Sequence, residues 1–350
     1  MNDMQNFLCD RPAIVFSEAN RKYLTGFCAD VGILTLYKDE KVLYVDGRYF
    51  EAAKNESFPD VTVKLLEKWS DTFQKIETVF SGEILTETEI SVKDFNIYNA
   101  MLKSSKLIAS DELSAKISDL RSRKTEKELG YIKTAQSYAE KAFLDVLDFI
   151  KVGVSEKEIA AYLEYRAKMH GTEEMAFKTI AISGKNTSMP HGVPSDKLVE
   201  AGDFITMDFG CTENGYCSDM TRTVAVNFAN DEMIKVYETV LKAGLEAEKT
   251  AKAGISAKTV DSAARKVIAE AGYGEYFTHS TGHGVGIEVH EDPNVSPKND
   301  TVLSVGNVIT DEPGIYMEGK FGVRIEDMLY IGENYVENLT NSQKNLIILK

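Results

Sequence analysis

The chain has 350 residues, 43% of them hydrophobic, and a formal net charge of -15. This length fits two domains or one large one, and the composition excludes disordered and collagen-like classes. Nucleic acid is also excluded as a partner, because no long basic segment offsets the repulsion between this charge and a phosphate backbone.

The start of the chain, MNDMQNFLCDRP, has neither the basic leader nor the apolar core of a secretory signal. No segment approaches the length and apolar character of a membrane span. The four cysteines lack CxxC spacing, which favours reduced thiols over disulfides. We therefore expect a soluble cytoplasmic enzyme with no membrane partner.

The first third of the chain alternates short strands and helices. Residues 12–17, 32–37 and 41–47 are strand-like, whereas 92–103 suits a helix. Acidic residues and histidines do not cluster in these segments. The sequence therefore predicts an α/β domain over 1–121 with no acid-base cluster.

A different pattern follows residue 121. Thr125 and Glu128 form a capping box ahead of apolar positions at helical spacing, which predicts a helix over 126–150. We therefore place the domain boundary here, with a second domain over 122–350.

The second domain repeats one order of elements. Its first half has helices, a loop with His191, and then strand-like runs that contain Asp208 and Asp219. Its second half has helices, a histidine-rich stretch, and then runs that contain Glu312 and Glu326. Two such halves facing each other would bring both carboxylate pairs to one centre. The other predicted helices cover 156–169, with a capping box of Ser155 and Glu158, and 231–252 and 257–271.

The two strand-like runs of the first half are joined by Asn214-Gly215, a strong signal for a two-residue hairpin turn. Such a turn sets Asp208 opposite Thr221 and makes Asp208 and Asp219 diagonal neighbours on one face. They would then be close enough to share a metal ion. A three-residue turn would place them on opposite faces.

Apolar residues surround each of these four carboxylates. A carboxylate removed from water must be neutralised by a proton, a basic partner or a metal. Arg222 and Arg324 are too few to balance all four, whereas two divalent cations carry four positive charges. The sequence therefore predicts a site for two divalent ions.

The predicted ligands are carboxylates together with one imidazole, that of His283. This set suits Mn²⁺ or Co²⁺, with Zn²⁺ or Fe²⁺ also possible, and disfavours thiophilic ions. Five side chains for two ions require bridging carboxylates and leave room for a bridging water. Two-metal hydrolases hold such a water, as hydroxide, between ions about 3.5 to 4 Å apart.

Each element also has a simpler explanation, because a lone Asp in a strand or a lone His is more often a structural residue. His170, beside Gly171 at a predicted helix end, is expected to be a capping or surface residue. For the other residues, the joint pattern favours metal binding. Other catalytic signatures are missing: there is no H-E-x-x-H, no G-x-S-x-G and no dinucleotide fingerprint.

The segments MPHG, MDFG, YCSDMTRT, HSTGHGVGIEVHE, DEPGIY and GVRIED occur in this order over 122–350. They resemble the signature segments of the metallopeptidase family of aminopeptidase P, prolidase and methionine aminopeptidase. NRKYLTGF and VDGRY resemble the extra N-terminal domain of the proline-specific members. The resemblance implies a creatinase-like α/β domain followed by an α+β pita-bread domain with an internal pseudo-two-fold duplication.

The resemblance also implies a role for each motif residue that could touch the metals. Asp208 would bind one ion, His283 and Glu312 the other, and Asp219 and Glu326 would bridge them. Glu312 would also accept the proton of the attacking water.

Other motif residues would act on the substrate. By the same resemblance, His191 and His290 would hold it and stabilise the oxyanion of the tetrahedral intermediate. His279 and Tyr316 would support them beside the substrate, and Arg324 would support the catalytic group. One departure from the family pattern is Asp311, which stands where relatives more often carry an apolar residue and adds negative charge beside the site.

The leading hypothesis is metal-dependent hydrolysis, by a metal-bridging hydroxide, of the bond between an N-terminal residue and proline. The partners would then be peptides with proline at the second position, as dipeptides or longer chains. An alternative is a pita-bread homologue that acts on a small non-peptide compound, as a lyase or amidinohydrolase. A non-catalytic binding module is a third, although such domains usually lose ligands. Because proline-specific relatives are often dimers, we expect a homodimer.

Overall fold

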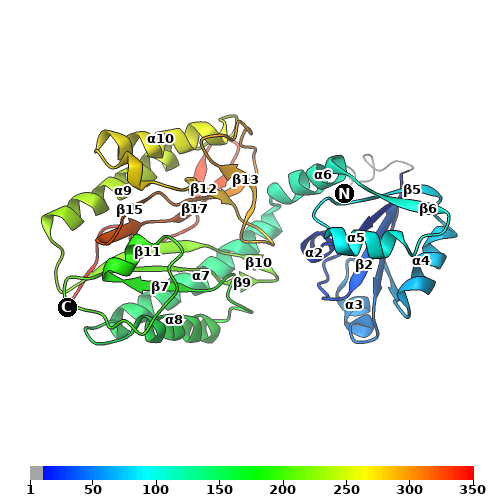
Figure 1. Ribbon diagram of the computed structural model, residues 1–350, viewed down its shortest axis with the longest axis horizontal. Helices are drawn as coiled ribbons and strands as arrows, with labels where there is room; N and C mark the ends of the chain where they lie inside the picture. Colours follow the sequence, from blue (N-terminus) through cyan, green and yellow to red (C-terminus); the bar gives the residue numbers. More distant parts are fainter. Residues whose placement is uncertain (1–10) are drawn as a thin grey trace. The chain divides into compact units, whose positions relative to one another are not determined.

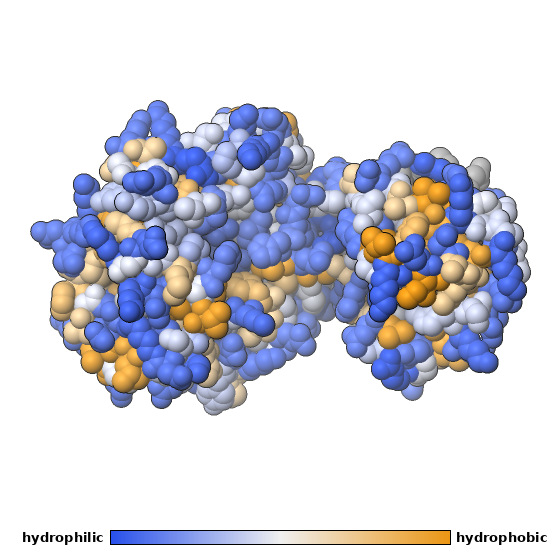
Figure 2. All heavy atoms as spheres, viewed as in Figure 1, coloured by the Kyte–Doolittle hydropathy of each residue, from blue (hydrophilic) through white to orange (hydrophobic). Residues whose placement is uncertain are grey.

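The computed structural model describes residues 11–350, which belong to two compact units, 1–121 and 122–350. Hydrophilic residues cover much of the visible surface of each unit (Figure 2). Among the described residues, no helix combines the length and apolar character that crossing a membrane requires.

The first unit contains one six-stranded sheet with strand order β4-β3-β2-β1-β5-β6. The pairs β1–β2 and β2–β3 are antiparallel, and the other pairs are parallel. One apolar cluster includes side chains of α2 and α6, and a second includes side chains of α4. The strands are β1 (Ala13–Val15), β2 (Gly32–Tyr37), β3 (Glu40–Val45), β4 (Val61–Leu65), β5 (Gly82–Thr86) and β6 (Ser105–Ala109). The helices are α2 (Glu18–Thr25), α3 (Phe50–Glu56), α4 (Trp69–Glu77), α5 (Val92–Asn99) and α6 (Asp111–Ser122).

The second unit has two helix pairs that enclose its strands. The first pair packs on one side and the second pair on the other (Figure 1). Both predicted capping boxes form, because Thr125 and Ser155 exchange hydrogen bonds with the glutamate three residues later. The four helices are α7 (Glu126–Phe149), α8 (Glu156–His170), α9 (Asp231–Thr250) and α10 (Ala257–Glu270).

Each helix pair covers its own sheet. The first sheet has strand order β19-β11-β8-β7 and packs against α7 and α8. The second has order β13-β12-β14-β17-β18 and, with the β15–β16 hairpin, packs against α9 and α10. The duplicated order of elements that the sequence predicts is therefore present. The strands are β7 (Ile180–Ser183), β8 (Phe204–Phe209), β11 (Met220–Val226), β12 (Gly282–Gly284), β13 (Glu291–Val295), β14 (Val308–Asp311), β15 (Gly314–Met317), β16 (Phe321–Arg324), β17 (Asp327–Ile331), β18 (Val336–Asn338) and β19 (Ile348–Leu349).

The predicted hairpin register is confirmed. The short strands β9 (Thr212–Glu213) and β10 (Tyr216–Cys217) leave Asn214 and Gly215 as a two-residue turn, with φ of 50° and 73°. Asp208 on β8 accordingly lies opposite Thr221 on β11. The turn length thus fixes which side chains of both strands share a face.

Candidate metal centre

The acidic side chains of the candidate centre lie in strands or at strand ends. Asp208 is in β8, and Asp219 immediately precedes β11. In the second sheet, β14 and β17 pair at Asp311 and Asp327, so the next pair in the same register is Glu312 and Glu326. The sheets bring these four carboxylates together from positions up to 118 residues apart in the sequence.

Five predicted ligands converge at this point. Asp219, His283 and Glu326 each offer one ligand atom within 4.8 Å of the others. His283 Nε2 lies 3.7 Å from Asp219 Oδ2 and 3.6 Å from Glu312 Oε1. Asp208 is close enough to Glu326 to be the main charged group acting on it. All five side chains are therefore neighbours.

Burial and mutual repulsion oppose ionisation of the carboxyl groups in this cluster. Burial first, and then Glu326, raises the pKa of both Asp219 and Glu312 well above the usual value. Burial and Asp208 likewise raise the pKa of Glu326 to about 8. Four adjacent carboxylates can therefore all be ionised at neutral pH only when cations lie among them.

The polar atoms that face the cluster fit such cations. The Oδ1 atoms of Asp208 and Asp219 are buried and have no hydrogen-bond partner within residues 11–350. His283 Nδ1 lies 3.1 Å from Gly284 O, which leaves Nε2 facing the carboxylates. Burial lowers the pKa of His283 to about 4, so its imidazole is neutral and has a free electron pair. Oxygen donors with one neutral imidazole are the ligands of hard to borderline divalent ions.

A buried network joins the carboxylates of the two halves. Arg324 Nη2 pairs with Asp208 Oδ2 at 2.5 Å, and its Nε donates to Thr221 Oγ1 at 3.0 Å. Thr221 Oγ1 in turn donates to Glu326 Oε2 at 2.7 Å. Sequence patterns do not single out Thr221 as a functional residue, although a spacing of two from Asp219 at the start of β11 indicates that both lie on one face.

Arg324 also reaches the predicted substrate-side residues. Its Nη1 donates to Tyr316 Oη at 2.8 Å, and Tyr316 Oη lies 2.9 Å from His279 Nε2. Burial and the charge of Arg324 lower the pKa of His279 to about 4, so this imidazole is neutral. The network therefore extends from Asp208 to His279; its centre at Arg324 and Tyr316 is buried, and its two ends are partly buried.

The two predicted substrate histidines are both exposed. The His290 ring centre lies 4.3 Å from that of His283. His191 lies in the loop between β7 and β8, and the carbonyl of its neighbour Pro190 accepts from Arg324 at 3.2 Å. His170 is elsewhere, at the last position of α8, where its Nε2 lies 2.6 Å from Asp145.

Asp311 is buried, and strand alternation directs it away from the side chain of Glu312. Burial and its cross-strand neighbour Asp327 raise the pKa of Asp311 well above the usual value. Asp327 is neutralised by Arg222 at 2.7 Å and Lys344 at 2.5 Å. Arg222 thus balances a carboxylate outside the predicted ligand set.

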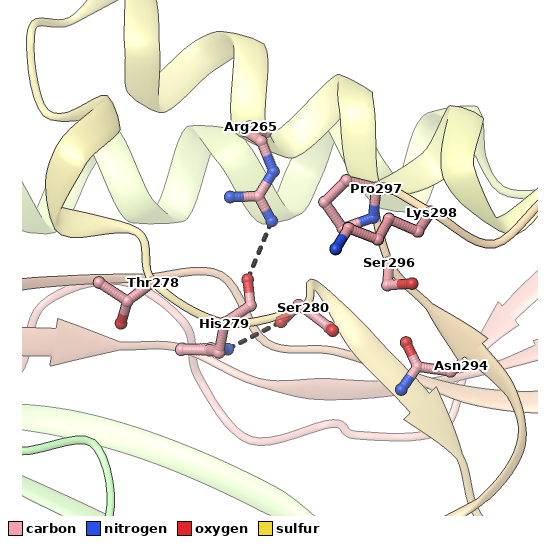
Figure 3. A pocket seen from close by; sticks show the side chains of 8 residues that line it. All are labelled: Arg265, Thr278, His279, Ser280, Asn294, Ser296, Pro297 and Lys298. Atoms are coloured by element: carbon pink, nitrogen blue, oxygen red, sulfur yellow. Dashed lines mark hydrogen bonds between the residues drawn. The ribbon is translucent and has the colours of Figure 1, made fainter.

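A surface pocket of about 420 Å³ adjoins His279 (Figure 3). Its wall includes Arg265, which donates to the carbonyl of His279 at 2.9 Å and pairs with the buried Asp261. The pocket is lined by Arg265, Thr278, His279, Ser280, Asn294, Ser296, Pro297 and Lys298.

The profile of metallopeptidase family M24 matches residues 130–333, and that of the creatinase/prolidase N-terminal domain matches residues 12–122. The chain belongs to metallopeptidase family M24. It is therefore a hydrolase of a family that uses divalent metal ions. The predicted family is confirmed, as is the predicted fold of a creatinase-type domain followed by a pita-bread catalytic domain.

Similar proteins extend over nearly the whole of this M24 peptidase. The Xaa-Pro dipeptidase of Pyrococcus furiosus is 40% identical over 350 residues, which is 99% of this chain and 96% of the relative. The X-Pro aminopeptidase structure from Thermotoga maritima has a TM-score of 0.91 at 36% identity and covers 99% of this chain and 100% of that one. The Xaa-Pro dipeptidase structure from Bacillus anthracis has a TM-score of 0.94 at 34% identity, with coverages of 99% and 98%.

Proposed function

We propose that this M24 peptidase hydrolyses the bond between an N-terminal residue and proline. The observation that carries the proposal is the convergence of four carboxylates and His283. Asp219 and Glu326 are buried and Asp208 and Glu312 partly buried, and buried oxygens of Asp208 and Asp219 have no hydrogen-bond partner within residues 11–350. Relatives named Xaa-Pro dipeptidase and X-Pro aminopeptidase, similar over nearly their full lengths, support the choice of substrate.

We propose two ions, most suitably Mn²⁺, held by the five ligands that the sequence indicates. As the family resemblance implies, Asp208 would bind one ion, His283 and Glu312 the other, and Asp219 and Glu326 both. Ligand atoms of Asp219, His283 and Glu326 within 4.8 Å of one another support this assignment. When bound, such ions make water nucleophilic at neutral pH and polarise the substrate carbonyl.

The other residues would then position the substrate and move protons. Glu312 is the carboxylate that would take a proton from the attacking water and carry it towards the leaving nitrogen. His191 and His290 are exposed beside the buried centre and would donate to the oxyanion and hold the peptide. Arg324, through Tyr316, would keep His279 in place beside the proline.

The proposal is tested with the full chain stripped of metal by a chelator. Refilling it with Mn²⁺, and in parallel with Co²⁺ or Zn²⁺, should restore cleavage of Xaa-Pro peptides but not of matched Xaa-Ala peptides. Comparing an Xaa-Pro dipeptide with an Xaa-Pro-Yaa tripeptide decides between dipeptidase and aminopeptidase. Turnover of neither peptide with any divalent ion overturns the proposal.

We also propose a homodimer located in the cytoplasm. Free, buried thiols at Cys211 and Cys217 support a reducing compartment. Cys28 is also free, and the remaining cysteine, Cys9, lies outside the described residues. Sedimentation of the full chain measures the number of subunits directly.

A further inference from the structure

A buried carboxylate joins the two ends of the loop that carries His191. Glu156, the first residue of α8, is fully buried. Its Oε1 accepts from the N–H of Ser183 at 2.7 Å and from Asn186 Nδ2 at 2.9 Å. Its Oε2 accepts from the N–H and the hydroxyl of Ser195, at 2.9 and 2.6 Å. One oxygen thus holds the chain before His191, and the other holds the chain after it.

The same loop is also fastened to the candidate centre. Thr187 Oγ1 accepts from the N–H of Gly322 at 2.8 Å, and Pro190 O accepts from Arg324. The side chain of His191, by contrast, is exposed and makes no hydrogen bond with any residue of 11–350. Its position is therefore determined by the backbone of the loop and not by contacts of the ring.

We infer that Glu156 is a positioning residue for catalysis, which sets the place of His191 through the closure of the 183–195 loop. The inference rests on the proposed function, in which His191 contacts the substrate. Although burial opposes ionisation, hydrogen bonds from Ser195 and Asn186 hold the pKa of Glu156 below its usual value, so the carboxylate is available as an acceptor at neutral pH.

Capping of α8 does not require Glu156. The helix is capped by Ser155, whose N–H and hydroxyl donate to Glu158 at 2.8 and 2.7 Å. Glu158 makes no hydrogen bond to the 183–195 loop within the described residues. The helix therefore offers two glutamates, two positions apart, of which one holds the helix end and the other holds the loop.

This pair allows a matched experiment. Glu156→Gln replaces one carboxylate oxygen by an amide NH₂, which cannot accept from the loop N–H groups, so the hydrogen bonds from Glu156 to one end of the loop are lost. We expect kcat and kcat/KM for an Xaa-Pro peptide to fall together by about 100-fold, as displacement of a positioned group by about 1 Å can produce. Metal content should be unchanged, and the control Glu158→Gln should keep near wild-type kcat.

Hydrogen exchange provides a measurement that does not depend on activity. Amides of 184–195 should exchange faster in Glu156→Gln than in Glu158→Gln, while those of α7 exchange alike in both. Equal protection of the loop in the two variants overturns the inference, whatever the substrate proves to be.

A double-mutant cycle separates positioning from general stability. If Glu156 acts through His191, then Glu156→Gln should lower kcat only slightly in a protein that already carries His191→Ala. Full additivity of the two losses overturns the inference alone. Wild-type activity of His191→Ala overturns both the role of His191 and the inference, and it leaves Xaa-Pro hydrolysis itself intact.

Discussion

Thr221→Val tests whether the buried network sets the affinity of the metal centre. Valine has nearly the shape of threonine, so the change removes only the hydroxyl that donates to Glu326 and accepts from Arg324. A hydrogen bond to an ionised group contributes about 1.5–3 kcal/mol, and about 1.4 kcal/mol is a tenfold change in binding. We therefore expect metal binding to weaken about 10- to 100-fold, the range found when groups that orient metal ligands are lost.

The assay is titration of the metal-free protein with Mn²⁺ by calorimetry or by competition with a chelating dye. Thr206→Val is the matched control, because Thr206 is also buried, on β8, and its hydroxyl hydrogen-bonds that of Thr223 at 3.1 Å instead of a carboxylate. Unchanged affinity in Thr221→Val, or an equal loss in Thr206→Val, would refute the reasoning that Thr221 orients Glu326.

Three further predictions concern a carboxylate of the first unit, an ion pair of the second unit and the effect of metal on stability. Against the opposing effect of partial burial, the N–H groups of residues 103–105 hold the pKa of Glu77 at about 2, below its usual 4.5. The ionised Glu77 therefore stabilises the folded protein above about pH 4.5, and this contribution is lost as pH falls towards about 2. Glu77→Gln should lower stability to urea at pH 7 and leave it unchanged at pH 2. Lys124 and Glu291 form a buried ion pair at 3.3 Å. Either Lys124→Met or Glu291→Gln should lower the free energy of unfolding, measured with denaturant, by about 3–5 kcal/mol. The double variant should lose less than the sum of the two single variants. Mn²⁺ at 100 times its Kd should stabilise the catalytic unit by about 2.7 kcal/mol, measured as a rise in Tm that a chelator reverses; a Tm independent of Mn²⁺ would contradict a folded-state metal site.

The features that sequence patterns predict here are those fixed by neighbouring residues. The capping boxes at Thr125 and Ser155 and the hairpin at Asn214-Gly215 each depend on side chains within four positions, so their outcome is determined locally. The hairpin then fixes which face Asp208 occupies, and so part of the centre could be derived before any tertiary contact was known.

The remaining features depend on segments that meet only after folding. Thr221 reaches Glu326 across 105 positions, and Glu156 reaches Ser195 across 39. The capping-box spacing assigns Glu158 to the helix end, but nothing near Glu156 in the sequence indicates that its carboxylate binds a distant loop. Which of the two becomes buried is decided by the loop that packs onto the helix.

The centre draws Asp208 and Asp219 from one half of the catalytic unit and His283, Glu312 and Glu326 from the other. Ions held there would act as reversible cross-links between two separately built layers. Binding of an ion and association of the layers are thermodynamically linked. The free energy by which the ion stabilises the association equals the free energy by which the association strengthens ion binding. Any ligand or substitution that separates the layers must then also weaken ion binding, even when it acts at a contact far from the carboxylates.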